Sequence, residues 1–158
     1  MNYHLAQINV AKMIAPLNSE IMVDFVNNLA RINALAETSE GFVWRLKDDA
    51  DNATTIKVFE DEFMIVNMSV WESKIALFNF TYSSAHVEIF KRRKEWFSKM
   101  TDSHIALWYV PADQIPNPKE AVERLYYLNE HGETPFSFSF KNEFNSDDAL
   151  TYERKNRK

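Results

Sequence analysis

The sequence predicts an α+β protein with a ferredoxin-like βαββαβ order, an antiparallel sheet, and an additional C-terminal helix and extended arm. Alternation of polar and apolar residues marks four strands, and stretches with helical spacing separate them. At residues 67–73 the stretch N-M-S-V-W-E-S joins a strand directly to a helix start. Two right-handed crossovers that return a strand to the same sheet place both helices on one face of it.

The first half of the chain supplies the β, α, β, β part of this order. Residues 3–10 alternate as a strand, and Ser19 caps a helix that continues to Thr38. Residues 42–46 and 63–71 are predicted to form a hairpin, with a polar tip at residues 48–52 and a short extra strand at 54–58.

The second half completes the order and adds the C-terminal elements. Residues 72–82 and 84–100 have helical spacing, and residues 104–110 form a strand that Pro111 ends. A third helix covers residues 119–131, and alternating phenylalanines at 135–140 indicate a strand or arm. We therefore predict one domain over residues 1–142 and a charged, disordered tail over residues 143–158.

Composition excludes several functions. Gly41 and Gly132 are the only glycines, so neither a dinucleotide-binding turn nor a Walker phosphate loop can be formed. The absence of cysteine excludes disulfides and thiolate ligands and favours a cytoplasmic protein. The net charge of −5 does not favour nucleic acid as a partner. The longest strongly apolar stretch, residues 105–112, is far below the roughly 20 residues that cross a bilayer, so no membrane association is expected.

No metal and no cofactor is expected. The four histidines, His4, His86, His104 and His131, lack the close spacing of zinc ligands. Asp49 and Asp51 lack the glycine and terminal glutamate of a calcium loop.

The two sheet faces differ in polarity. One carries Ala6, Ile8 and Val10 and suits packing against the helices. The opposite face mixes amides with large rings, which predicts that a partner sheet encloses a small-molecule cavity there, most simply in a homodimer. In the alternative, the C-terminal arm covers this face with Phe136, Phe138 and Phe140 as its lid. The residues of the mixed face are Tyr3, Leu5, Gln7, Asn9, Phe63, Ile65, Asn67, Ser69 and Trp71.

Several stretches together carry a family resemblance: N-M-S-V-W-E-S at 67–73, S-S-A-H at 83–86, R-R-K-E-W-F at 92–97 and L-W-Y-V-P-A at 107–112. With Y-H-L-A-Q-I-N-V-A at the start, they resemble a bacterial domain-of-unknown-function family (number 3291) of the dimeric α/β-barrel superfamily. They are similar, more loosely, to antibiotic-biosynthesis monooxygenases. The resemblance implies a homodimer whose sheets close into a barrel, with a pocket between sheet and helices in each subunit. It implies no particular reaction, because relatives include cofactor-free monooxygenases, haem proteins and members with no known activity.

The leading hypothesis is a cofactor-independent, monooxygenase-like enzyme that acts on an aromatic or carbonyl compound. Asn67, Trp71 and His86 are the candidate catalytic residues, because amides hold oxygen atoms, a Trp ring stacks on planar molecules and His serves as an acid or base. The candidate substrate-binding residues are Gln7, Asn9, Trp44, Ser69, Arg93 and Trp108.

Three alternatives stay open: a non-catalytic ligand-binding protein, a structural dimer, and a haem-binding protein with His86 or His104 as ligand. Trp44 and Arg45 point to opposite faces of their strand, so only one of them can line the pocket, and the sequence does not fix which.

Overall fold

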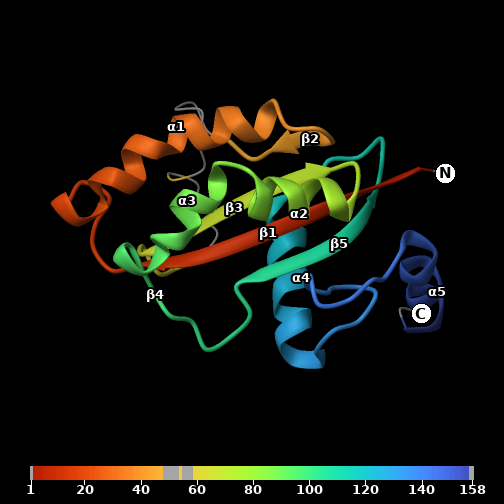
Figure 1. The fold of residues 1–158 in the computed structure, drawn as a ribbon. Coiled ribbons are helices and arrows are strands. Elements are labelled where there is room, and N and C mark those ends of the chain that lie inside the picture. The colour runs from red at the N-terminus through yellow and green to blue at the C-terminus, as the bar shows by residue number, and fades with distance from the viewer. Residues whose placement is uncertain (1, 48–53, 55–58, 157–158) are drawn as a thin grey trace.

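A computed structural model of the chain describes residues 2–47, 54 and 59–156, which contain one antiparallel sheet with helices on both of its faces (Figure 1). The predicted tip at 48–52, with Asp49 and Asp51, and the extra strand at 54–58 lie outside these residues except for Thr54, which is in a turn. The strands are β1 (Tyr3–Met13), β2 (Phe42–Arg45), β3 (Met64–Trp71), β4 (Phe97–Ser98) and β5 (Ile105–Pro111). The helices are α1 (Val23–Glu37), α2 (Lys74–Ser83), α3 (His86–Lys91), α4 (Pro118–His131) and α5 (Ser146–Asn156), with short 3-10 turns η1 (Glu20–Met22) and η2 (Arg93–Glu95).

The strand order confirms the ferredoxin-like prediction. β1 lies at the centre, pairs antiparallel with β3 on one side and with β5 on the other, and β2 pairs with the outer edge of β3. β4 pairs with the last residues of β1 only, at Lys12 and Met13. The fold is therefore a mixed α+β fold with an additional C-terminal helix, as the sequence predicts.

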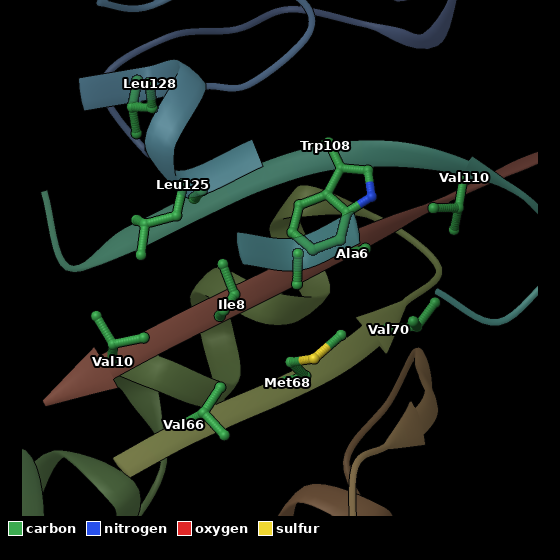
Figure 2. Packing of buried hydrophobic residues seen from close by; sticks show 12 residues of the cluster. Ala6, Ile8, Val10, Val66, Met68, Val70, Trp108, Val110, Leu125 and Leu128 are labelled. Carbon is green, nitrogen blue, oxygen red and sulfur yellow. The ribbon is translucent and has the colours of Figure 1, made fainter. Parts of the chain in front are cut away.

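The assignment of helices to the two sheet faces was wrong. The aliphatic face of β1, β3 and β5 packs against α4, with Leu125 and Leu128 above Ile8 and Trp108 (Figure 2). α1 and α2 instead cover the mixed face, where Ala36 and Leu77 join the cluster around Trp71. Alternation fixes which side chains share a face, but the choice of face by a crossover helix depends on the whole connection.

The predicted helix at residues 84–100 is much shorter in the structure. α3 ends at Lys91, η2 follows, and residues 97–98 return to the sheet as β4. Trp96 is almost fully buried against Met13 and Met22. Because this side chain must reach the end of β1, the backbone leaves the helix before it.

The predicted disordered tail is wrong for residues 146–156, which form α5. The hydroxyl groups of Tyr127 and Tyr152 are hydrogen-bonded, and Glu153 lies 3.8 Å from Arg124 of α4. The polar composition of the segment gave no sign of these contacts with α4, because only a few of its side chains make them.

The predicted arm at residues 135–140 pairs with β5 through a single bridge between Leu107 and Phe138, with two backbone hydrogen bonds of 2.7 and 3.0 Å. Phe138 is fully buried in the Trp71 cluster, and Phe136 is buried against Tyr127 of α4. The arm therefore closes the free edge of β5 and contacts both helix layers.

Candidate functional site

A strip of polar side chains crosses the middle of the sheet on the face that α1 and α2 cover. Gln7 and Asn9 of β1 stand directly opposite Ser69 and Asn67 of β3. The Gln7 amide nitrogen donates hydrogen bonds to Asn67 Oδ1 at 2.6 Å and to Ser69 Oγ at 2.8 Å. One glutamine thus links both polar residues of the neighbouring strand.

Trp71 belongs to the same network. Its indole Nε1 donates to Ser69 Oγ at 2.8 Å, so this oxygen accepts two hydrogen bonds. The Ser69 hydroxyl proton must therefore point away from both donors. Trp71 is 1% exposed, with its ring stacked on Phe80 at 5.2 Å, so it fixes the position of Ser69 from within the core.

The other end of the strip is open. Asn67 is exposed and Asn9 half-buried, although both lie on the face below the helices. Asn67 Oδ1 already accepts from Gln7, so the Asn67 amide N–H groups stay available to a ligand. α1 packs loosely on this face, since Ala36 is its only buried residue and Phe25, Leu29 and Ile32 of its inward stripe are half-buried.

His86 stands at the start of α3, half-buried in the helix layer. Its Nδ1 lies 3.1 Å from the carbonyl oxygen of Thr81, which can only accept, so Nδ1 carries the proton and Nε2 presents a lone pair. Burial lowers the pKa of His86, and the hydrogen bond to Thr81 opposes this in part. The ring is thus neutral near pH 7 and suited to take up a proton.

Rings connect His86 to the strip. The His86 ring lies 5.0 Å from Phe80, and Phe80 stacks on Trp71. On the other side, Phe90 lies 6.2 Å from His86. His86 and Trp71 are therefore neighbours through one intervening ring and make no direct ring contact.

The structure settles the choice between Trp44 and Arg45. Arg45 stands opposite Ser69 on the polar face, buried, and donates to Glu37 Oε1 of α1 at 3.0 and 3.2 Å. Trp44 stands opposite Val70 and packs against the aliphatic cluster below α4. A bulge between Phe42 and Trp44 sets this register, which sequence alternation alone does not reveal.

Two other candidate binding residues lie away from the strip. Trp108 is fully buried on the aliphatic face, below Arg124 of α4. Arg93 is exposed, with its guanidinium 4.3 Å above the Phe90 ring. The structure thus brings together Gln7, Asn9, Asn67, Ser69 and Trp71, places His86 one ring away, and separates Trp44 and Trp108 from them.

The Trp71 end of the strip is filled by protein. Phe138 of the arm, Leu77 and Phe80 pack into the same cluster as Trp71, so the alternative in which the arm covers this face holds at that end. Two surface hollows, of about 280 and 310 Å³, lie elsewhere, between α4, α5 and the end of β5, and beside the start of α2. Neither is lined by Asn67, Trp71 or His86.

Sequence reasoning missed the residues that prepare the site. Thr81 fixes the His86 tautomer through its backbone, and a backbone carbonyl leaves no sequence signal. The ion pair of Arg45 and Glu37 lies at one side of the polar strip. The two residues are eight positions apart, on either side of a turn, so no local pattern indicates that they meet. Among the described residues, no group of three or more His, Asp or Glu could hold a metal ion, and no helix is both long and apolar enough to cross a membrane.

Comparison with known proteins identifies a family and several similar folds. Residues 4–155 match the family model described as a domain of unknown function, DUF3291. No curated protein matches the chain. PA3566 from Pseudomonas aeruginosa is 13% identical, with a TM-score of 0.46 over 73% of this chain and 98% of its own. A variant of SnoaB, a cofactor-independent oxygenase from Streptomyces nogalater, is 13% identical with a TM-score of 0.45, covering 71% of this chain and 95% of its own. Rv0793 from Mycobacterium tuberculosis is 13% identical with a TM-score of 0.44, covering 72% and 99%.

Proposed function

Because this chain belongs to the DUF3291 family of domains of unknown function, we propose a function from its own site: it binds a small planar molecule with oxygen substituents over Asn9 and Asn67 and acts on it as a cofactor-independent, monooxygenase-like enzyme. One observation carries the proposal. Asn67 is exposed on the face below the helices, while its amide is held from behind by the buried Gln7–Ser69–Trp71 network. An amide fixed in this way can hold a ligand oxygen with little loss of side-chain entropy.

The chemistry follows from what each group can donate or accept. His86 Nε2 accepts a proton from an acidic C–H or O–H group of the substrate, and the Asn67 amide donates to the oxygen on which negative charge develops. The resulting carbanion transfers electrons to O₂, which is the oxidant, and forms a C–O bond. The hydroperoxide then loses water, so a CH₂ group and O₂ become C=O and H₂O.

Trp71 acts in this scheme as a positioning residue, because the core buries it and its indole holds Ser69. Ser69 holds the Gln7 amide, and Gln7 in turn holds Asn67. The protein would act in the cytoplasm, as its cysteine-free sequence favours.

Anthrone is a suitable probe, because its methylene protons are acidic and oxygenation converts it to a quinone. We expect the purified protein to accelerate O₂ consumption and quinone formation without added metal or cofactor. Asn67→Ala and His86→Gln should each lower the rate by about 10²-fold or more, as expected for an oxyanion donor or a general base. Asn79→Ala, which removes an exposed amide on the outer side of α2, is the matched control.

The outcomes separate the proposal from its alternatives. Anthrone binding that depends on Asn67 without turnover would identify a non-catalytic binding protein. A Soret band after addition of haem, abolished by His86→Ala, would identify a haem protein. Neither binding nor turnover would leave a structural role as the better account.

A further inference from the structure

The hollow between α4, α5 and the end of β5 takes no part in the polar strip. Its volume is about 280 Å³, near the lower limit of the roughly 300–1,000 Å³ of ligand pockets, so it suits a small molecule. We call it the α4–α5 hollow. An apolar part of its wall is formed by Val110, Ile115, Pro116, Ala149 and Leu150, and Tyr3 lines it as well.

The charged side chains of the α4–α5 hollow come from both helices. Arg124 of α4 is 8% exposed, and its Nη2 lies 3.4 Å from Glu120 Oε1 and 3.8 Å from Glu153 Oε1 of α5. Direct bonds between a guanidinium and a carboxylate are usually about 2.7–2.9 Å long, so both contacts are loose. Among the described residues that line the hollow, no other side chain is charged. Two carboxylates around one guanidinium leave one negative charge in excess.

A buried donor without a partner lies next to Arg124. Trp108 is fully buried, and its Nε1 has no acceptor among the described residues. The Arg124 guanidinium lies 5.9 Å from the centre of the Trp108 ring. Figure 2 shows the indole nitrogen on the side of the ring that faces Val110, which lines the hollow. Buried N–H groups are normally paired, so this one indicates an acceptor oxygen at the floor of the hollow.

We propose that the α4–α5 hollow binds a free α-amino acid with an apolar side chain. The ligand carboxylate lies at the floor, where it accepts from Trp108 Nε1 and from Arg124 in place of Glu153. The ligand ammonium group lies between Glu120 and Glu153 and supplies the positive charge that the hollow lacks. The ligand side chain contacts the apolar part of the wall.

The combination of charges excludes simpler ligands. A carboxylic acid without an amine would face Glu120 and Glu153 with no second cation to offset their repulsion. An amine without a carboxylate would leave the Trp108 N–H unpaired and would place a cation beside Arg124. Only a ligand that carries both groups side by side satisfies all four residues. This inference does not depend on the proposed reaction, because the hollow shares no residue with the polar strip.

Calorimetric titration of the full chain with L-phenylalanine tests the proposal. Phenethylamine and 3-phenylpropionate keep the ring but each lacks one of the two charged groups. We expect the amino acid to bind at least about 10-fold more tightly than either, as for hydrogen bonds to charged groups. This comparison needs no variant, so it decides even if a change at Arg124 prevents folding.

A pair of variants on α5 locates the binding. Glu153→Gln should weaken L-phenylalanine binding by about 10-fold. Asp147→Asn is the matched control, because it removes the same charge from an exposed position of the same helix outside the hollow.

The NMR signal of the Trp108 indole N–H, assigned with Trp108→Phe, reports the carboxylate. L-leucine is the probe here, since it has no ring to perturb the signal. We expect the Trp108 signal to move downfield, while the Trp71 signal, whose N–H is already bonded to Ser69, stays in place. An unmoved Trp108 signal with bound ligand overturns the proposal. So does a chain that binds neither amino acid in the millimolar range, equal affinity for the amine or the acid, or equal effects of Glu153→Gln and Asp147→Asn.

Discussion

Two tryptophans on opposite faces of the sheet are both buried, but their indole nitrogens differ. Trp71 Nε1 donates to Ser69 Oγ, while Trp108 Nε1 has no partner among the described residues. The buried Trp108 N–H without an acceptor costs free energy, so its removal is not penalised. Removal of the Trp71 N–H, in contrast, loses a hydrogen bond.

We therefore expect Trp71→Phe to lower the free energy of unfolding by about 1–3 kcal/mol more than Trp108→Phe, since both changes remove a similar ring volume. Urea denaturation of the two variants measures this difference. Equal losses would mean that the Trp71–Ser69 bond contributes nothing beyond packing.

His86 makes stability depend on pH in a defined direction. Burial lowers its pKa in the folded protein, so below the ordinary value of 6.5 the unfolded chain binds the proton more readily. The stabilisation is complete above pH 6.5 and is lost as the pH falls through the lower folded pKa. His86→Gln should flatten this acid-side loss, measured by thermal unfolding between neutral and acidic pH.

An NMR titration of the His86 ring provides a direct check, with a midpoint expected below 6.5. Because burial also lowers the pKa of His104, some pH dependence should remain in His86→Gln. A His86 midpoint at or above 6.5 would contradict the argument that burial lowers its pKa.

Among the elements, the connection from α1 to β2 depends on one glycine. Gly41 has a φ of +83°, and a Cβ added there would lie 2.5 Å from the Ala76 Cβ of α2. Its carbonyl also accepts from the Glu72 amide at 2.7 Å. The turn is thus pressed directly against the start of α2.

We expect Gly41→Ala to destabilise the fold by about 2–4 kcal/mol, from backbone strain and overpacking together. Gly132→Ala is the control, because Gly132 also has a positive φ, +75°, but nothing lies within 4 Å of an added Cβ. It should cost only about 1 kcal/mol. Thermal unfolding compares the two, and Gly41→Ala with Ala76→Gly should recover part of the loss.

One lysine links the start of α2 to the end of the arm and the residues that follow it. Lys74 Nζ, at the start of α2, donates to the Phe140 carbonyl at 3.2 Å, to the Asn142 carbonyl, and to Glu143 at 2.8 Å. The Lys74 side chain is only 14% exposed. Replacing it removes three bonds to a segment that pairs with β5 through a single bridge.

Lys74→Met should accelerate hydrogen exchange at the Leu107 and Phe138 amides, which bond each other across that bridge, and leave the β1–β3 amides protected. Lys141→Met, an exposed position on the same arm, should change neither. Unchanged exchange in Lys74→Met would show that the arm stays in place without the bonds from Lys74.

The elements were largely predictable from the sequence, because their signals are local. Period-two alternation located β1 and β3, and helical spacing over residues 119–131 located α4. The early end of α3 and the presence of α5 were not predictable, because the packing of Trp96 and the contact of Tyr152 with Tyr127 decide them. Tertiary contacts of this kind leave no periodic pattern.

The candidate site was predictable in composition but not in geometry. The sequence indicated that Gln7, Asn9, Asn67 and Ser69 share a face, and the register of β1 and β3 places them on one face. It did not reveal that α1 and α2 cover that face. Which crossover helix covers which face is a property of the whole molecule.

At the scale of the whole molecule, β1 joins all the apolar clusters. Ile8 belongs to the cluster with α4, Leu5 to the cluster around Trp71, and Met13 to the cluster around Trp96. No cluster can be lost without exposing side chains of the same central strand. We therefore expect the described helices and strands to unfold together, in a single transition.

The native tryptophans, one buried in each cluster, make the single unfolding transition testable. Trp71, Trp96 and Trp108 lie in three different clusters. Three variants each keep one of these tryptophans and have the others replaced by Phe. The fluorescence of each variant then reports the unfolding of one cluster. Within each variant, the denaturation midpoint from fluorescence should coincide with the midpoint from far-ultraviolet circular dichroism. An earlier fluorescence midpoint for the Trp108 variant alone would mean that α4 leaves the sheet before the rest unfolds. The aliphatic face would then be accessible to a second sheet, as the expected sheet-to-sheet homodimer requires.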